Sequence, residues 1–268
     1  DEAVNAGSGT GNVIQNNLPL DIDVILDIEN DSIWLGNTNV ATITINDATG
    51  NVEIKVNGKT IATPELNEGT VVQTISADDI VGGENTVEAT YMGVTATKTF
   101  YVYGVVTNET YSIYFNRSNS GRLSDFVPEG ATLDFQGKFL SSADEPFAME
   151  INKPVNIITS TNDAYIDLNT TAGSLMGENP GNRFTISFNG SGTNMTGIKF
   201  HNSQLWLYNT HNVTLDGVSN VIEDKQVGSG VGATSIRANS TNVTVKNGYF
   251  YTKNNGGSSS LVLAWADY

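Results

Sequence analysis

The segment Leu205-Trp-Leu-Tyr-Asn-Thr-His-Asn-Val-Thr-Leu215 recurs thirty residues later, and this recurrence indicates how the second half of the chain folds. The later copy reads Ser235-Ile-Arg-Ala-Asn-Ser-Thr-Asn-Val-Thr-Val245 and aligns without a gap. A shorter relative, Asn194-Met-Thr-Gly-Ile198, begins 18 residues before Asn212. Repeats of roughly 20–30 residues are typical of solenoids, in which short strands stack on one another. The sequence therefore predicts a right-handed parallel β-helix over residues 105–268, continuing beyond Tyr268.

The alignment of the two long copies also predicts which residues face the interior of the β-helix. The expected inward pairs are Val213 with Val243, Leu215 with Val245, and Phe200 with Phe250. Trp206 and Tyr208 align with Ile236 and Ala238, which favours core positions for both aromatic residues over an alternative role in stacking on sugars. Strands stacked in this way bond to equivalent strands one rung above and below.

Tyr249 and Tyr251 flank Phe250 in the last recognisable coil. Successive residues of a strand point to opposite faces, so an inward Phe250 sends both tyrosines outward. We therefore take Tyr249 and Tyr251 as the candidate glycan-binding residues. The alternative is that they are two exposed tyrosines on a β-rich surface.

The first part of the chain has a different pattern. Residues 1–19 are small, polar and without periodicity, which predicts a linker with a composition typical of disordered segments. Residues 20–104 contain six or seven short alternating segments, such as Ala41-Thr-Ile-Thr-Ile45, separated by turn residues. Asn57-Gly58 is a strong signal for a two-residue hairpin. This size and pattern predict an immunoglobulin-like β-sandwich, so the whole chain is expected to be all-β.

Composition and charge exclude several classes of partner. The chain contains 32 Asn and 30 Thr, and only 16% of its residues are charged, against about 25% in an average globular protein. The net charge of −16 and the lack of clustered basic residues argue against nucleic acid and against anionic membranes. We see no hydrophobic segment that would insert into a membrane. Cysteine does not occur, so cysteine usage leaves the compartment open.

Sequons favour an extracellular location, with the protein as a glycoprotein. Nine asparagines begin Asn-x-Ser/Thr motifs and are candidate glycosylation sites: Asn30, Asn108, Asn116, Asn169, Asn189, Asn194, Asn212, Asn239 and Asn242.

Catalytic chemistry has little support in the sequence. A polysaccharide lyase would need calcium-binding carboxylates beside an Arg or Lys base, and a glycoside hydrolase would need two carboxylates about 5–10 Å apart. The candidate clusters are Asp216, Glu223 and Asp224 near Arg237 and Lys246, and a second cluster of Asp163 and Asp167. Neither forms a repeated outward row of acids, so we predict solvated surface residues and no catalytic site.

Metal binding is also weakly supported, and we predict no cofactor. An acidic group near the start of the sandwich could hold Ca²⁺, but it lacks the spacing of a calcium loop, and an acidic edge strand is the preferred interpretation. Its members are Asp21, Asp23, Asp27, Glu29 and Asp31. His201 and His211 have no acidic neighbour in sequence, and we expect both in turns of the β-helix.

Two modules of the chain resemble those of adhesin-like surface proteins of methanogenic archaea. The segments 51–60 and 83–91 are similar to their bacterial-Ig-like repeat, and the segments 130–138 and 151–157 together with the Asn-Val-Thr coils are similar to their pectate-lyase-like β-helix. The resemblance implies a cell-surface protein that attaches to a glycan or protein of another cell. Two alternatives remain: a β-helix lyase or hydrolase, and a structural stalk whose binding tip lies elsewhere.

Overall fold

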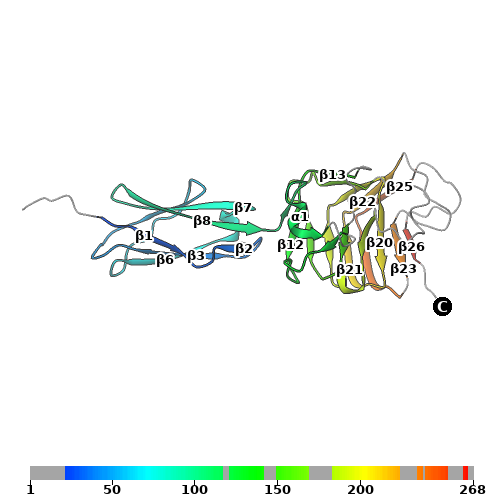
Figure 1. Ribbon diagram of the computed structural model, residues 1–268, viewed down its shortest axis with the longest axis horizontal. Coiled ribbons are helices and arrows are strands. Elements are labelled where there is room, and N and C mark those ends of the chain that lie inside the picture. The colour runs from blue at the N-terminus through cyan, green and yellow to red at the C-terminus, as the bar shows by residue number, and fades with distance from the viewer. Residues whose placement is uncertain are drawn as a thin grey trace, which may run out of the picture.

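The computed structural model describes residues 22–116, 121–141, 149–168, 183–223, 234–237, 239–252 and 262–264. In these residues the protein is all-β, as predicted, with only short helical segments between strands. These segments are the single turn α1 (Tyr111–Tyr114) and the 3-10 turns η1 (Ala77–Asp79) and η2 (Phe188–Gly190). Strands β1 to β8 lie at one end of the long axis and the later strands at the other (Figure 1).

The first eight strands form two sheets. One contains β1 (Ile25–Ile28), β3 (Asn39–Thr44) and β6 (Thr70–Ile75) in antiparallel pairs. The other runs in the order β2 (Ser32–Trp34), β8 (Val94–Tyr103), β7 (Gly83–Tyr91), β4 (Glu53–Val56) and β5 (Lys59–Ala62). Inward side chains from both sheets share one hydrophobic core.

The hairpin predicted at Asn57-Gly58 is confirmed. It joins β4 to β5, with Val56 paired to Lys59. Both turn residues have positive φ angles, 51° and 79°, as a two-residue turn matched to the strand twist requires.

Three further sheets make up the rest of the described chain. The β12 sheet contains β9 (Val105–Val106), β12 (Thr132–Phe135), β15 (Asn156–Ile158), β18 (Asn194–Thr196), β21 (His211–Asp216) and β24 (Thr241–Lys246). The β13 sheet contains β13 (Lys138–Leu140), β16 (Tyr165–Asp167), β19 (Lys199–His201), β22 (Ser219–Ile222) and β25 (Tyr249–Thr252). The β14 sheet contains β10 (Phe115–Asn116), β11 (Arg122–Leu123), β14 (Met149–Ile151), β17 (Arg183–Ile186), β20 (Gln204–Tyr208), β23 (Thr234–Arg237) and β26 (Val262–Ala264).

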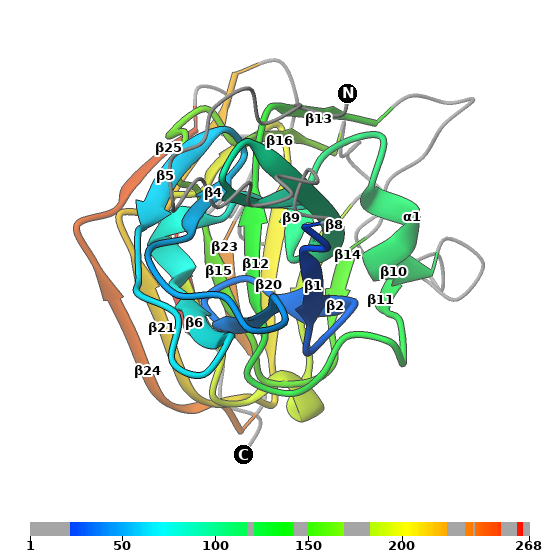
Figure 2. The same ribbon diagram turned by 90° about the vertical axis from the view of Figure 1, so that its left-hand side faces the viewer.

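From β12 onward the chain visits these three sheets in rotation. Each strand pairs in parallel with the strand that comes three positions later, so β12 pairs with β15, β13 with β16 and β14 with β17. Viewed along the long axis, β24, β25 and β14 lie on different sides of the molecule (Figure 2). The interior is a second hydrophobic core, which begins at Val106.

Stacking within this core confirms two of the three predicted inward pairs. Val213 pairs with Val243 and Leu215 with Val245. Phe200 and Phe250 share a column but are not neighbours, because Asn220 lies between them.

The predicted alignment of Asn194 with Asn212 is wrong. Asn194 pairs with Thr214, so the step between these coils is 20 residues instead of 18. This register brings Gly197 level with Gly217 at the corner after each strand, where a Cβ added to Gly217 would lie 3.8 Å from the backbone of Gly197.

The two cores meet at a short, well-bonded joint. The Gly104 amide donates to the hydroxyl of Tyr114 (2.8 Å), and the amide of Asp134 donates to the Gly104 carbonyl (2.8 Å). Gly104 has a φ of 123°, and a Cβ there would lie 2.6 Å from the carbonyl oxygen of Thr132, so only glycine fits. Burial raises the pKa of Tyr114, which keeps this hydroxyl neutral.

Aromatic rings cover the same joint. The ring of Trp34 lies 5.7 Å from that of Tyr103 and 5.3 Å from that of Phe126, and Tyr103 and Phe126 are 4.7 Å apart. The amide of Leu35 donates to the Tyr103 carbonyl (2.8 Å). Side chains from both ends of the molecule therefore pack together here.

Candidate functional site

The outer face of the β14 sheet carries a candidate site built from neighbouring strands. Glu150, Thr185 and Trp206 lie in one row across strands β14, β17 and β20. The next row, which contains Ile151 and Leu207, is fully buried. Because neighbouring residues of a strand point to opposite faces, the Glu150 row points outward.

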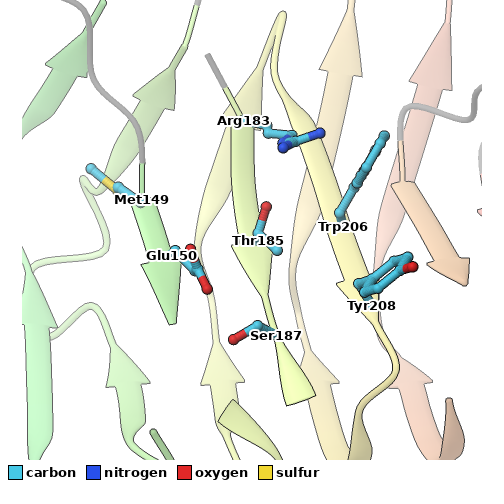
Figure 3. Close-up of a pocket in the computed structure, with 7 residues that line it drawn as sticks. All are labelled: Met149, Glu150, Arg183, Thr185, Ser187, Trp206 and Tyr208. Atoms are coloured by element: carbon cyan, nitrogen blue, oxygen red, sulfur yellow. The ribbon is translucent and has the colours of Figure 1, made fainter. Parts of the chain in front are cut away.

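These outward side chains surround a shallow pocket of about 390 Å³ (Figure 3). Its lining residues come from three neighbouring strands and the residue after one of them: Met149, Glu150, Arg183, Thr185, Ser187, Trp206 and Tyr208. Tyr208 is 50% exposed at the edge of the pocket, whereas Trp206 is half-buried. The pocket therefore offers one exposed aromatic ring and one partly covered ring beside charged groups.

Trp206 is contacted by two arginines from opposite sides. The guanidinium carbon of Arg183, on β17, lies 4.3 Å from the centre of the indole ring, and that of Arg237, on β23, lies 4.9 Å from it. Strands β17 and β23 flank β20, so each arginine reaches over Trp206 from its own side. Such cation–π contacts hold both the ring and the guanidinium groups in place.

Two polar atoms of this arrangement are buried without a hydrogen-bond partner in the described residues. They are the Nε of Arg183 and the indole Nε1 of Trp206. Burial lowers the pKa of the Arg183 guanidinium, an effect that nearby Glu150 opposes and Arg237 increases. Glu150 itself is ion-paired with Arg122 (Nε–Oε2 3.1 Å). Buried donors of this kind are expensive to leave unsatisfied, so they are suited to receive a ligand.

The core positions favoured for Trp206 and Tyr208 are wrong. Trp206 pairs with Ser235 and Tyr208 with Arg237, one residue away from the predicted partners. The corner between β23 and β24 is one residue longer than that between β20 and β21, and this insertion shifts the register. A shift of one residue exchanges the two faces of a strand.

Tyr249 and Tyr251 lie on a different surface, the outer face of the β13 sheet. They are 61% and 40% exposed, while Phe250 between them is half-buried. Tyr165 lies in the same outward column as Tyr249, with Lys199 and Ser219 between them. Ligand binding by these tyrosines stays a prediction.

His201 on this face has two acidic neighbours that are distant in sequence. Its Nδ1 lies 3.0 Å from a carboxylate oxygen of Asp167, and its Nε2 lies 3.9 Å from one of Glu223. Tyr165 stacks on the imidazole at 5.5 Å. The expectation that both histidines lie in turns is wrong, because His201 belongs to β19 and His211 begins β21.

The first predicted acidic cluster is spread over three sheets. Asp216 pairs with Lys246 (3.1 Å) on the β12 sheet, whereas Glu223 follows β22 and Arg237 lies on β23. The Asn247 amide and Lys246 lower the pKa of Asp216. Asp224 lies outside the described residues.

The two residues of the second acidic cluster, Asp163 and Asp167, contact different partners. Asp163 accepts hydrogen bonds from the Thr161 hydroxyl and the Gly137 amide, which lower its pKa, whereas Asp167 contacts His201.

The predicted acidic group near the first strand is exposed. Asp23, Asp27, Glu29 and Asp31 all face solvent, and Asp21 lies outside the described residues. Within the described part of the chain, no cluster of three or more His, Asp or Glu side chains is arranged to hold a metal ion.

Eight sequon asparagines lie in the described chain, and all are exposed; Asn169 lies outside it. Asn212 and Asn242 stack at the start of β21 and β24, joined by a side-chain hydrogen bond of 2.6 Å. No helix in the described ranges has the length and hydrophobicity to span a membrane.

Comparison with protein-family models gives no match, and comparison with curated proteins gives none either.

Proposed function

We propose that this chain is part of a non-enzymatic, extracellular, adhesin-like protein that attaches a cell to glycans through the outer surface of a right-handed parallel β-helix. In this proposal the two antiparallel-rich sheets of strands β1–β8 are an immunoglobulin-like sandwich that carries the β-helix. The rotation of the chain through three parallel sheets supports the β-helix. The resemblance to adhesin-like surface proteins of methanogenic archaea supports the cellular role.

The pocket at Trp206 carries the binding part of the proposal. Glycan sites combine aromatic rings, which stack on sugar rings, with hydrogen-bonding groups at the rim. Trp206, Tyr208 and Arg183 supply both elements on one outward surface. A stalk without a binding role would not need buried donors on its outer face.

One observation favours an enzymatic alternative. Asp167 and Glu223 both approach His201 on the β13 sheet, and two carboxylates on one exposed surface are the minimum for glycoside hydrolysis. At the Trp206 pocket, by contrast, Glu150 is the only carboxylate among the lining residues, and it is engaged by Arg122. The pocket geometry therefore supports binding better than cleavage.

The chain is expected to bind at least one class of glycan on an array and to release no sugar products. The measurement pairs the array with assays for new reducing ends and for unsaturated uronate products from acidic polymers. Turnover that disappears in the double variant Asp167→Asn/Glu223→Gln would replace the proposal with the hydrolase. Failure to retain any glycan or any cell would favour the stalk.

A further inference from the structure

A pocket of about 300 Å³ lies at the joint between strands β1–β8 and the three-sheet part of the chain (strands β9–β26). It lies where β2 and β12 approach each other (Figure 1). One wall is the turn that follows β2, and the other is the turn that precedes β12, so each part of the molecule supplies one wall. The boundary between two folded parts is a common position for a ligand site.

The two walls are built in the same way. A hydrogen bond from the fourth amide to the first carbonyl closes the turn 34–37 (3.0 Å) and the turn 128–131 (3.3 Å). The third residue of each turn is a glycine with a positive φ, 91° at Gly36 and 78° at Gly130, as a type II turn requires. A Cβ placed on either glycine would have no neighbour within 4 Å, so a ligand can approach the backbone of both turns.

Contacts at the base of the pocket fix the separation of the walls. A Cβ added to Gly104 would lie 2.6 Å from the carbonyl oxygen of Thr132 and 3.0 Å from the Cβ of Leu35, so the two walls meet at this glycine. The Trp34 ring lies 5.3 Å from that of Phe126 and thus holds one part against the other. The shape of the pocket is set before a ligand arrives, which lowers the entropic cost of binding.

The side chains that line the pocket include polar groups that are available to a ligand. Asn37 and Glu129 are exposed, and neither side chain makes a hydrogen bond or ion pair in the described part of the chain. The same holds for the hydroxyl of Thr132. Trp34 is a half-buried lining residue beside them. Among the described lining residues, Glu129 is the only charged one.

These groups narrow the class of ligand. A carboxylate accepts hydrogen bonds, whereas an amide and a hydroxyl both donate and accept, which matches the hydroxyl groups of a sugar. The apolar face of a sugar ring packs on an indole ring. An acidic sugar would bring a second anion beside Glu129, with no lysine or arginine among the described lining residues to offset it. A cationic amine would pair with Glu129 but would offer no acceptor to the donors of Asn37 and Thr132.

We propose that this joint pocket binds a neutral sugar residue, with Trp34 contacting the ring and Asn37, Glu129 and Thr132 bonding its hydroxyl groups. The inference rests on the proposed function and adds to it a second glycan site, separate from the Trp206 pocket. Asn37 belongs to one wall and Glu129 to the other, so a bound sugar bridges the two parts of the molecule.

The test is titration of the full chain with methyl glycosides of the gluco, manno and galacto series, each as the neutral sugar, the uronate and the 2-amino sugar. We expect at least one neutral sugar to bind, and to bind at least about fivefold more tightly than its charged counterparts. Saturation-transfer NMR detects the bound sugar. Changes in the amide chemical shifts of Gly36 and Gly130 show whether it lies between the two turns.

Matched variants locate the site. Glu129→Gln and Asn37→Ala should each weaken binding of that sugar about fivefold or more, because each removes a hydrogen-bonding group from one wall. Both residues are exposed, so neither substitution is expected to unfold the chain. Asp125→Asn is the control for Glu129→Gln, because it removes an exposed carboxylate that is not among the described lining residues. It should leave the affinity unchanged.

The outcomes separate this inference from the proposed function. Equal losses with Asp125→Asn and Glu129→Gln, or binding that leaves the amides of Gly36 and Gly130 unchanged, would overturn the joint site. Tighter binding of a uronate or a 2-amino sugar would overturn the neutral ligand. If none of the sugars binds, the joint site falls, and the glycan array still decides the adhesin. A sugar bound at the joint of a chain that no array glycan or cell retains would keep the site and overturn the attachment function.

Discussion

Replacing Phe200 with alanine is expected to lower the free energy of unfolding of the three-sheet part by about 3–5 kcal/mol. Phe200 is 1% exposed in the second core, and its ring meets that of Phe184 edge to face at 5.2 Å. The coil above and the coil below are fixed by their own hydrogen bonds, so they cannot collapse into the space that the ring leaves. The cost therefore combines lost burial with a cavity.

Thermal or urea unfolding of the variant measures this loss, and Lys199→Ala is the matched control. Lys199 precedes Phe200 on β19 and is exposed, and its side chain donates to the carbonyl of Asn162 (2.8 Å). Its replacement should change stability by no more than about 0.5 kcal/mol. Equal effects of the two substitutions would contradict the assignment of Phe200 to the inner face of β19 and Lys199 to its outer face.

In the interior of the three-sheet part, the pairs that could be predicted are those where adjacent coils have equal lengths. Between β21 and β24 the repeat has no insertion, and Val213 over Val243 followed directly from the alignment. The predicted alignment of Asn194 with Asn212 was wrong because the Asn-x-Thr motif that the two segments share is too short to fix how their strands pair. The observed register sets Asn194-Met-Thr196 beside Thr214-Leu-Asp216, with which it shares no residue type at any paired position.

The direction of the Trp206 and Tyr208 side chains was predicted wrongly for a related reason. The gapless alignment spanned a corner that is two residues long after Tyr208 and three residues long after Arg237. Corners are where solenoid repeats vary in length, and one extra residue reverses the face of every residue before it. Alternation within a single strand was the safer guide: Arg183-Phe184-Thr185-Ile186 places Arg183 opposite Phe184 without reference to another coil.

The contacts around His201 and Trp206 could not have been derived from neighbours in sequence. Asp167 is 34 residues from His201, and Arg183 and Arg237 come from strands on either side of β20. A parallel stack brings residues together only through its register, so an error of one rung removes every such contact.

The joint explains how the proposed binding face could be presented. Gly104 admits no side chain, its amide and carbonyl are both bonded, and Trp34 packs against Phe126 across the boundary. A connection of this kind limits rotation between the first eight strands and the three-sheet part. The outer face of the β14 sheet would then keep a fixed orientation relative to strands β1–β8.

Replacing Asn85 with alanine is expected to destabilise the first core by about 2–4 kcal/mol while leaving the second core intact. The Asn85 side chain is fully buried on β7 and accepts hydrogen bonds from the Val81 amide (2.9 Å) and the Asn57 side chain (2.8 Å). It also donates to the carbonyls of Val81 (2.7 Å) and Gly83 (3.0 Å). Alanine removes all four bonds at once, and the groups that remain out of reach of water lose their partner.

Calorimetry tests this loss together with the independence of the two cores. Asn51→Ala is the matched control, because Asn51 is exposed and donates a single side-chain bond to the Thr63 carbonyl (2.8 Å), so we expect a loss below about 1 kcal/mol. If the two sheets of strands β1–β8 and the three-sheet part unfold separately, Asn85→Ala lowers one transition and Phe200→Ala lowers the other. A single transition lowered by both variants would instead mean that the contacts around Gly104 and Trp34 couple the two cores into one unfolding unit. The chain would then not divide near residue 104 into two parts of independent stability.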